Sequence, residues 1–525
     1  MSRKFTEGTL RDIVFVFLVI KINSFVMDNI RIKNYRCFDD TGAVDIKHIT
    51  VLVGANSSGK SSFLKFFGLI KQSVSEFVRG FFLWQGPLID FNDFDNVVKD
   101  RDKPIEVDFD IKNLPIYTDF KMFRGQVSDV HLHLEIGKDD PEREYDILQK
   151  MIISFDGNVF ELNFNSDRSA YIIINGIRSL EIGDVIKWGL TNSLFPKIAF
   201  MPNKEGFDDE RSFKIFKRMQ DIIKKVSAKD ERHIFFTPRY RYSFDKSLLK
   251  KYISRQGNGK LSEADIETMS NMAMYFSINT FLDSLNFYML HLCKKMTYVM
   301  PLRAIVQRYY RYNNYAVDSI DADGGNLPMF FNGLSADAFK KFNEHWLLPI
   351  FKFELKLRSS GEGHVELLVK EKDKEERNLI DVGFGYTQIL PILTILWKAI
   401  MMDCVGTDEK DDFCKSHIIA IEQPELHLHP RFQGLFVDML DKVIAICHKE
   451  KKDVRIIVET HSEVIVNRLG IKIMDDNSYL KTDDVNVMLF NAKEEGFDTD
   501  VISSSFNDEG YLTNWPFGFF SDNVY

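Results

Sequence analysis

Residues 54–61, GANSSGKS, have the spacing G-x-x-x-x-G-K-[ST] that binds nucleotide phosphates. Glycines let the backbone curl so that successive N–H groups point at the phosphates, and the positive end of a following helix adds to that field. We expect Lys60 to reach the terminal phosphates and Ser61 to provide a ligand for Mg²⁺. The phosphate-binding residues predicted in this loop are Gly54, Asn56, Ser57, Ser58, Gly59, Lys60, Ser61 and Ser62.

A phosphate loop needs an acidic partner at the end of a buried strand, and Glu422 follows the apolar run at residues 418–421. We expect Glu422 to hold Mg²⁺, directly or through water, while Pro424 turns the chain out of the sheet. A second strand end, VETHSE at residues 458–463, places His461 within reach of the terminal phosphate. The sequence therefore predicts a Mg²⁺-dependent nucleotide site assembled from three distant segments.

The elements that must position these residues alternate between strands and helices. Residues 27–54 predict strand, turn and strand, and a helix follows from about Lys60. A helix is also predicted at ILPILTILWKAI, before the strand that carries Glu422, and another from about Pro430, between that strand and VETHSE. Strands alternating with helices predict an α/β fold with a parallel or mixed sheet.

The chain divides by pattern into four segments. Residues 1–26 are interpreted as an added strand or a translation-start artefact, and 27–177 as a first lobe that holds the phosphate loop and antiparallel hairpins. Residues 178–297 turn helical and aromatic and are interpreted as an inserted helical domain. Residues 298–525 return to a mixed α/β pattern.

Bulk properties limit the class of protein. The 525 residues are 45% hydrophobic and 28% charged, which is typical of a globular protein. Five scattered cysteines without C-x-x-C spacing predict no disulfide framework or zinc cluster and favour a cytoplasmic location. The eight apolar residues 13–20 are too few to span a bilayer, which needs about 20, so no membrane association is expected.

Residues 237–260 could contact nucleic acid, because seven basic residues there are interleaved with tyrosine and phenylalanine and accompanied by one acid, Asp245. The net charge of −9 argues against electrostatic binding of nucleic acid over the whole protein surface. A solvated helix face with packed aromatics is the leading alternative. Arg303, in a second basic and aromatic stretch, is expected to be a core residue or to lie near the nucleotide.

Taken together, the motifs resemble the single-chain ABC-superfamily ATPases related to RecF, SMC and OLD proteins. Four matches occur in order over residues 27–525: the phosphate loop, DVGFGYTQ in the signature-loop position, IEQPELHLHP as the Walker B and D-loop region, and THS with the switch histidine. The ending GYLTNWPFGFF, with IEQPELHLHP and VMPLRAIVQRYY, is most similar to the PtuA family of Septu-type anti-phage ATPases, including retron-associated forms.

The resemblance implies a P-loop ABC-type ATPase head that binds ATP and Mg²⁺ and dimerises head to head, or forms a higher homo-oligomer. Gly383, Gly385 and Thr387 of one copy would close over nucleotide on the other, since small residues before a helix offer N–H groups and a hydroxyl to the γ-phosphate. A glycine-rich turn that caps a helix from about Gln388 is the alternative. Arg36 is a further candidate nucleotide contact.

One departure from the family pattern concerns catalysis. Most of the superfamily has a glutamate after the Mg²⁺ carboxylate, whereas this chain has Gln423. Glutamine can orient the attacking water but cannot accept its proton, which predicts slow hydrolysis, with Glu459 or Glu425 as a substitute base. The resemblance assigns His429 to the D-loop. With His427 it lacks a third metal ligand in the sequence, so metal binding there is the weaker interpretation.

The resemblance also implies a partner. In Septu-like systems it is an HNH nuclease, and in retron-like systems a reverse transcriptase with its RNA–DNA product (msDNA) as well. The first alternative is a RecF/SMC-like repair or recombination ATPase that clamps DNA, although long heptads for coiled-coil arms are absent. An OLD-type nuclease is disfavoured because the 64 residues after His461 show no acidic cluster.

Overall fold

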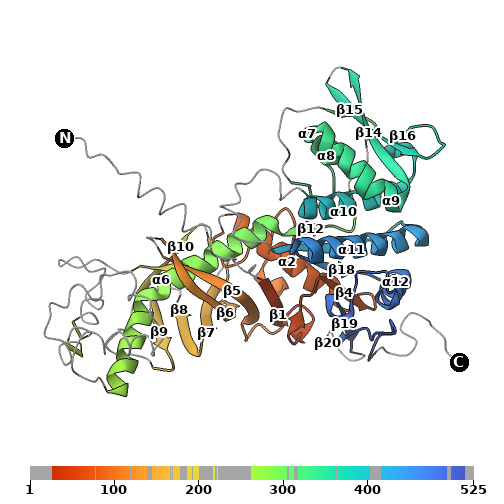
Figure 1. Cartoon of the computed structure of the whole chain (residues 1–525). Helices are drawn as coiled ribbons and strands as arrows, with labels where there is room; N and C mark the ends of the chain where they lie inside the picture. The colour runs from red at the N-terminus through yellow and green to blue at the C-terminus, as the bar shows by residue number, and fades with distance from the viewer. Residues whose placement is uncertain are drawn as a thin grey trace, which may run out of the picture.

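The computed structural model shows an elongated molecule with two large sheets side by side (Figure 1). It describes residues 26–514 apart from a set of internal segments. These gaps are 77, 119–120, 139–144, 166, 168, 178–185, 192, 200–216, 219–220, 223–261, 304–306, 312–316, 318, 362, 402–415 and 494–497.

The nucleotide-binding half is built on a six-stranded mixed sheet in the order β12-β17-β18-β4-β19-β20. Its strands are β12 (Thr297–Val299), β17 (Ser416–Glu422), β18 (Asp453–Glu459), β4 (Ile49–Gly54), β19 (Val485–Ala492) and β20 (Thr499–Ser504). All neighbouring pairs are parallel except β19 with β20. The carboxyl ends of β4, β17 and β18 therefore meet at one edge of the sheet, which is where α/β proteins bind ligands.

Helices cover both faces of this sheet. All six residues of β4 are buried, and its alternate side chains belong to two separate cores. Leu52 packs in the core of α2 (Lys60–Ser75) and α6 (Glu263–Lys295). Val51 and Val53 face the opposite core, formed by α10 (Phe384–Met401), α11 (Pro430–Glu450) and α12 (Glu463–Met474). This two-sided burial explains why the strand is continuously apolar.

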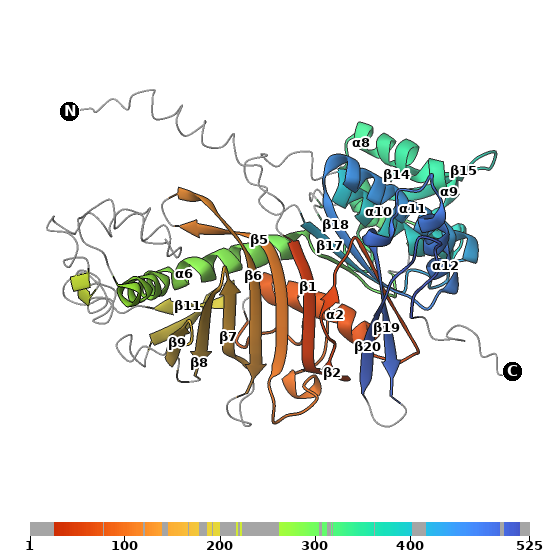
Figure 2. The same cartoon turned by 60° about the horizontal axis from the view of Figure 1, so that its bottom comes forward.

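The second large sheet is antiparallel and has ten strands, in the order β11-β10-β9-β8-β7-β6-β5-β1-β2 with β3 paired to β1. Its bounds are β1 (Val26–Tyr35), β2 (Phe38–Asp40), β3 (Val44–Asp45), β5 (Ile105–Thr118), β6 (Lys121–Gly137), β7 (Ile147–Phe155), β8 (Asn158–Phe164), β9 (Ser169–Ile174), β10 (Ile186–Thr191) and β11 (Ser193–Ala199). Helix α6 lies across one face of this sheet (Figure 2).

A smaller layer completes the molecule above α10. Strands β13 (Tyr310–Arg311), β14 (Phe353–Gly361), β15 (His364–Glu371) and β16 (Arg377–Asn378) form an antiparallel sheet. The short helices α7 (Leu327–Gly333), α8 (Ala336–Lys341), η2 (Phe342–Leu347) and α9 (Leu348–Phe351) precede β14, and the turn η3 (Leu379–Asp381) leads toward α10. Phe342, Trp346 and Trp397 join this layer to the α10 core.

The prediction of a helical insert at 178–297 is wrong for residues 186–199, whereas residues 263–295 are helical as α6. Residues 186–199 form β10 and β11, which extend the antiparallel sheet instead of opening a helical domain. Helix α6 packs on that sheet, where Asn286 and Asn279 hydrogen-bond the backbone of β11. Residues 223–261, and with them the basic stretch 237–260, lie outside the described residues. The antiparallel hairpins expected within 81–177 are present as β5 to β9.

One helix among the described residues, α10, is long and apolar enough to cross a membrane, with a mean hydropathy of 1.3 over 18 residues. However, 72% of that window is buried inside the protein. Its buried apolar side chains belong to the core on one face of the central sheet, which accounts for this apolar sequence.

Candidate nucleotide-binding site

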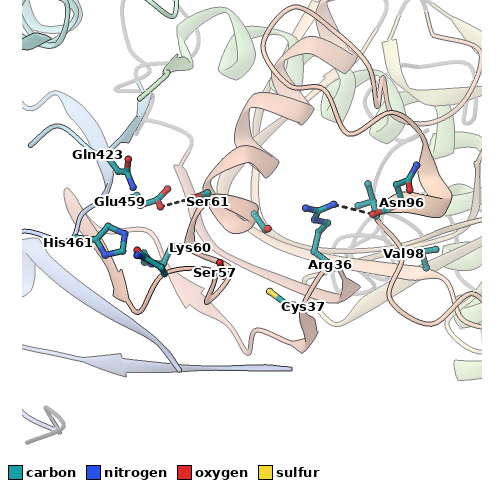
Figure 3. A pocket seen from close by; sticks show the side chains of 14 residues that line it. Arg36, Cys37, Ser57, Lys60, Ser61, Asn96, Val98, Gln423, Glu459 and His461 are labelled. Carbon is teal, nitrogen blue, oxygen red and sulfur yellow. Dashed lines mark hydrogen bonds between the residues drawn. The ribbon is translucent and has the colours of Figure 1, made fainter. Parts of the chain in front are cut away.

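The predicted phosphate loop lines an open cleft of about 490 Å³ at the carboxyl edge of β4 (Figure 3). We call it the P-loop cleft. Its lining residues are Arg36, Cys37, Asn56, Ser57, Gly59, Lys60, Ser61, Ser62, Asn96, Val97, Val98, Gln423, Glu459 and His461. The structure thus brings together residues from the turn between β1 and β2, the phosphate loop, the segment 96–98 and the ends of β17 and β18.

Both glycines of the motif are required by the local geometry. A Cβ on Gly54 would lie 2.4 Å from the carbonyl oxygen of Phe490, so β19 leaves no space for a side chain. Gly59 has a φ of +93°, and a Cβ there would lie 2.4 Å from Cys37 Sγ. Ser57 also has a positive φ of 60°, which turns the exposed tip of the loop. The backbone can therefore curl as phosphate binding requires.

Lys60 occupies the centre of the loop. Its ammonium donates to the carbonyl oxygens of Gly54 and Ala55, at 3.0 and 2.6 Å, and to Ser58 Oγ at 3.4 Å. The residue is 2% exposed, and burial lowers the pKa of Lys60. The ammonium is thus stabilised by the loop, close to where phosphate oxygens would bind.

Ser61 and Glu459 join the phosphate loop to the neighbouring strand β18. Ser61 Oγ donates to Glu459 Oε1 at 2.6 Å, and Glu459 Oε2 is buried with no hydrogen-bond partner among the described residues. Burial, with a smaller contribution from Glu422, raises the pKa of Glu459 to about 7. A buried carboxylate with a free oxygen next to the motif serine is well placed to receive a cation or a proton.

Glu422 lies one strand further from the loop, because β18 separates β17 from β4. Its Oε1 accepts a hydrogen bond from the Tyr298 hydroxyl, and its carbonyl oxygen lies 3.5 Å from Arg303 Nη2. Burial raises the pKa of Glu422 and lowers that of Arg303 to about 10. Arg303 is 8% exposed, so it is a core residue adjacent to the site, as predicted.

The segments that follow β17 and β18 hold three further predicted residues, of which Gln423 and His461 line the cleft and Glu425 does not. Gln423 lines the cleft with a φ of 40°, and its N–H donates to the Glu459 carbonyl at 2.9 Å. Glu425 Oε1 accepts from the His461 N–H at 2.7 Å, while its Oε2 is buried without a partner. Burial raises the pKa of Glu425, and burial together with Lys60 lowers the pKa of His461. The imidazole is thereby favoured in its neutral form.

The acidic residues fit a hard cation such as Mg²⁺. Glu422, Glu425 and Glu459 are clustered, their pKa values are all raised by burial, and two of them keep an unpartnered oxygen. Carboxylates in such surroundings need a nearby positive charge to ionise fully. Ser61, Glu422 and Glu459 are the residues that would hold Mg²⁺, and Glu459 is the one in direct contact with the motif serine.

Arg36 lies at the opposite end of the cleft from His461 (Figure 3). It has a φ of 55°, donates to the Asn96 carbonyl at 3.1 Å and stands 5.2 Å from the ring centre of Phe91. Val97 and Val98 line the same end. This end offers one exposed cation and an apolar wall, which suit the base, sugar or first phosphate of a nucleotide.

The glycines of the signature-like loop lie outside the P-loop cleft of their own chain. Helix α10 begins at Phe384, and Gly383, with a φ of 94°, precedes it in open space. Phe384 is 75% exposed, whereas Thr387 is 9% exposed and its hydroxyl donates to the Phe384 carbonyl at 2.8 Å. The groups presented outward are therefore Gly383, Phe384 and the half-buried Gly385, and Thr387 would have to break an internal bond to reach a phosphate.

The two D-loop histidines have separate structural surroundings. His429 caps α11, since its side chain accepts a hydrogen bond from the Arg431 N–H at 3.2 Å. His427 is exposed, has a φ of 60° and lies 6.2 Å from the Phe384 ring, centre to centre. The D-loop and the start of α10 thus share one surface beside the P-loop cleft.

Several residues of the site carry no signal in the sequence. Tyr298 holds Glu422 but lies in the short strand β12, and Asn96, Val97 and Val98 follow an irregular turn capped by Asp93. Asn96, Val97 and Val98 reach the cleft because Val98 pairs with Tyr35 in the tertiary structure.

With the site described, comparison with known proteins gives its class. The family model described as "AAA ATPase domain" matches residues 27–466, and the chain belongs to this family. The match begins at β1, and it includes the phosphate loop, Glu422 and His461.

More distant similarities are partial or low in identity. A segment of 101 residues is 34% identical to the endonuclease GajA of Bacillus cereus (strain HuB5-5) and covers 18% of this chain and 14% of that protein. The Smc head domain of Pyrococcus furiosus, bound to the C-terminal domain of ScpA, aligns with 12% identity over 92% of this chain and 96% of that one, at a TM-score of 0.35. The SMC head domain of Thermotoga maritima aligns with 10% identity over 91% and 98%, at a TM-score of 0.32.

Proposed function

We propose that this protein binds ATP with Mg²⁺ in the P-loop cleft and hydrolyses it slowly, so that nucleotide acts as a switch. The proposal rests chiefly on one observation: Ser61 of a complete phosphate loop is hydrogen-bonded at 2.6 Å to a buried glutamate of the adjacent strand. Membership of the AAA ATPase domain family supports the same reading. Arg36 and the valines beside it would bind the remainder of the nucleotide.

In this proposal each group has a separate task. Bound Mg²⁺ would neutralise charge on the terminal phosphates. Lys60 would leave the loop carbonyls and donate to phosphate oxygens, and His461 would donate to the γ-phosphate. Gln423 would orient a water whose oxygen bonds to the γ-phosphorus as the bond to ADP breaks, and Glu425, the buried carboxylate that is not assigned to Mg²⁺, would take the proton released.

The test is ATP binding and hydrolysis by the purified chain. Wild type is expected to bind MgATP, whereas Lys60→Ala loses binding at least tenfold, because the loop keeps no cation for the terminal phosphates. Lys340→Ala is the control, since Lys340 is an exposed lysine of α8 that pairs with Glu344 of the same helical segment. If Lys60→Ala and wild type bound ATP equally, the proposed site would be wrong.

We further propose that two copies close head to head over ATP, each presenting Gly383, Gly385 and the exposed Phe384 to the nucleotide of the other. This arrangement is supported by the position of these residues, which lie outside the cleft of their own chain, near the D-loop. ATP would then join the two copies, and hydrolysis would release them.

The partial identity to the endonuclease GajA supports a role beside nucleic-acid cleavage. We propose that this ATPase is the regulatory subunit of an anti-phage system of the Septu or PtuA type, with a separate HNH nuclease as partner. In a retron-type system a reverse transcriptase and its RNA–DNA product would join the complex. Co-purification of a nuclease with wild type, but not with Gly383→Glu, would support this role, and cleavage of DNA by the chain alone would contradict it.

A further inference from the structure

At the edge of the central sheet opposite the P-loop cleft, three metal-binding side chains converge. His48 directly precedes β4, His448 lies in the last turn of α11, and Asp484 ends the turn η4 (Thr482–Asp484) just before β19. One ligand atom from each lies within 4.8 Å of the others. Since β4 rises about 3.3 Å per residue over six residues, this cluster lies about 20 Å from the phosphate loop.

We propose that His48, His448 and Asp484 form a binding site for a divalent transition-metal cation of the Zn²⁺ type. Imidazole nitrogen and carboxylate oxygen are ligands that Zn²⁺ accepts, at about 2.0–2.2 Å. In a tetrahedral site these bond lengths separate two ligand atoms by about 3.4 Å. His448 Nε2 and Asp484 Oδ1 are already 3.0 Å apart.

The surroundings orient two of the ligands. His48 Nδ1 is 2.9 Å from the Val454 carbonyl, so this nitrogen carries the proton and Nε2 keeps a lone pair. Asp484 is 6% exposed, and its Oδ2 accepts from the Lys481 N–H at 3.0 Å, which leaves Oδ1 facing His448. A backbone carbonyl behind a ligand histidine and a second hydrogen bond behind a ligand carboxylate are the outer contacts that metal sites use.

The third ligand can complete the site by a small movement. The His448 side chain is 44% exposed, and its ring already lies 5.9 Å from that of His48, centre to centre. Rotation of this exposed ring would bring the ligand atoms, which lie within 4.8 Å of one another, closer to tetrahedral spacing. The three protein ligands leave a fourth position open to solvent, where water would bind. The cation would then tie α11 to the amino ends of β4 and β19.

The experiment compares metal binding by the full chain and three variants after chelator treatment. Wild type is expected to bind one more equivalent of Zn²⁺ than His448→Ala or Asp484→Asn in calorimetric titration. With Co²⁺ as probe, wild type gains the intense visible absorption of a four-coordinate site, and both variants lack it. Asp484→Asn keeps an oxygen for the Lys481 N–H, so its fold should be preserved.

His345→Ala is the matched control, because His345 is an exposed histidine outside the cluster and should bind as wild type does. Zn²⁺ is expected to raise the Tm of wild type and of this control but not of His448→Ala. Equal stoichiometry and equal Co²⁺ spectra in wild type and His448→Ala would overturn the proposal. The three residues would then form only a structural His–Asp contact between α11 and η4.

Discussion

At the scale of single residues, the site depends on buried carboxylates that need a nearby positive charge to ionise. Because the pKa of Glu459 lies above its ordinary value of 4.5, the folded protein holds a proton that the unfolded chain releases. The contribution of Glu459 to stability therefore falls as pH rises from about 4.5 to about 7 and stays low above that range. Mg²⁺ with nucleotide would remove this penalty.

We accordingly expect Glu459→Gln to raise the Tm of the nucleotide-free protein at pH 8 by about 2 °C and to change it little at pH 5. The amide oxygen still accepts from Ser61, while the buried charge is gone. Differential scanning calorimetry at the two pH values measures this, with Glu463→Gln, an exposed glutamate of α12, as control. A Tm lowered equally at both pH values would contradict the account.

A second residue-scale expectation concerns Gln423. Gln423→Glu places a carboxylate where the present amide can only orient water, so ATP turnover should increase by about tenfold or more. Steady-state phosphate release gives the rate, and ATP affinity measured in parallel separates catalysis from binding. Unchanged turnover would show that the proton acceptor lies elsewhere and that Gln423 does not limit the rate.

At the scale of elements, the phosphate loop is held by close packing at Gly59. Gly59→Ala combines the cost of a left-handed backbone, about 1–2 kcal/mol, with a contact to Cys37, and we expect it to abolish ATP binding. Gly157→Ala has the matching backbone cost, since its φ is +74°, but no atom lies within 4 Å of the new Cβ. Binding by Gly59→Ala as tight as that of Gly157→Ala would show that the loop tolerates this contact.

The loop before α10 offers a similar matched pair. A Cβ at Gly383 or at Gly363, in the β14–β15 turn, has no atom of the described residues within 4 Å, and both residues have a positive φ. Gly383→Glu should therefore fold as well as Gly363→Glu yet lose ATP-dependent association, because the new carboxylate would face phosphate on the second copy. Light scattering with ATP distinguishes the two variants. Association by Gly383→Glu would argue against contact between Gly383 and the nucleotide of the second copy.

Local chemistry in the sequence was enough to predict the strands and helices around the motifs. Helix α2 begins at Lys60 and α11 at Pro430, as predicted, and Glu422 ends β17. The extent of the antiparallel sheet was not predictable in the same way, because the aromatic segment at 186–199 is short and its strand pairing is decided by packing against α6. The Tyr298–Glu422 contact likewise depends on the tertiary position of β12.

At the scale of the whole molecule, β18 lies between the phosphate-loop strand and the Glu422 strand. This order makes Glu459 the direct neighbour of Ser61, a role that the motif pattern alone assigned to Glu422. The same parallel strands end at two opposite edges, with the P-loop cleft at one and the His48 cluster at the other. Nucleotide and the proposed metal would thus act on the same sheet from opposite ends.

The most direct test of the account is the mass of the protein in solution with and without nucleotide. For wild type we expect light scattering to give 61.2 kDa without nucleotide and twice that mass with MgATP, and Lys60→Ala to stay at 61.2 kDa in both. Slow hydrolysis should keep the larger species present during the measurement. A mass that is the same with and without MgATP, for a wild-type protein shown to bind ATP, would contradict the claim that nucleotide joins two copies.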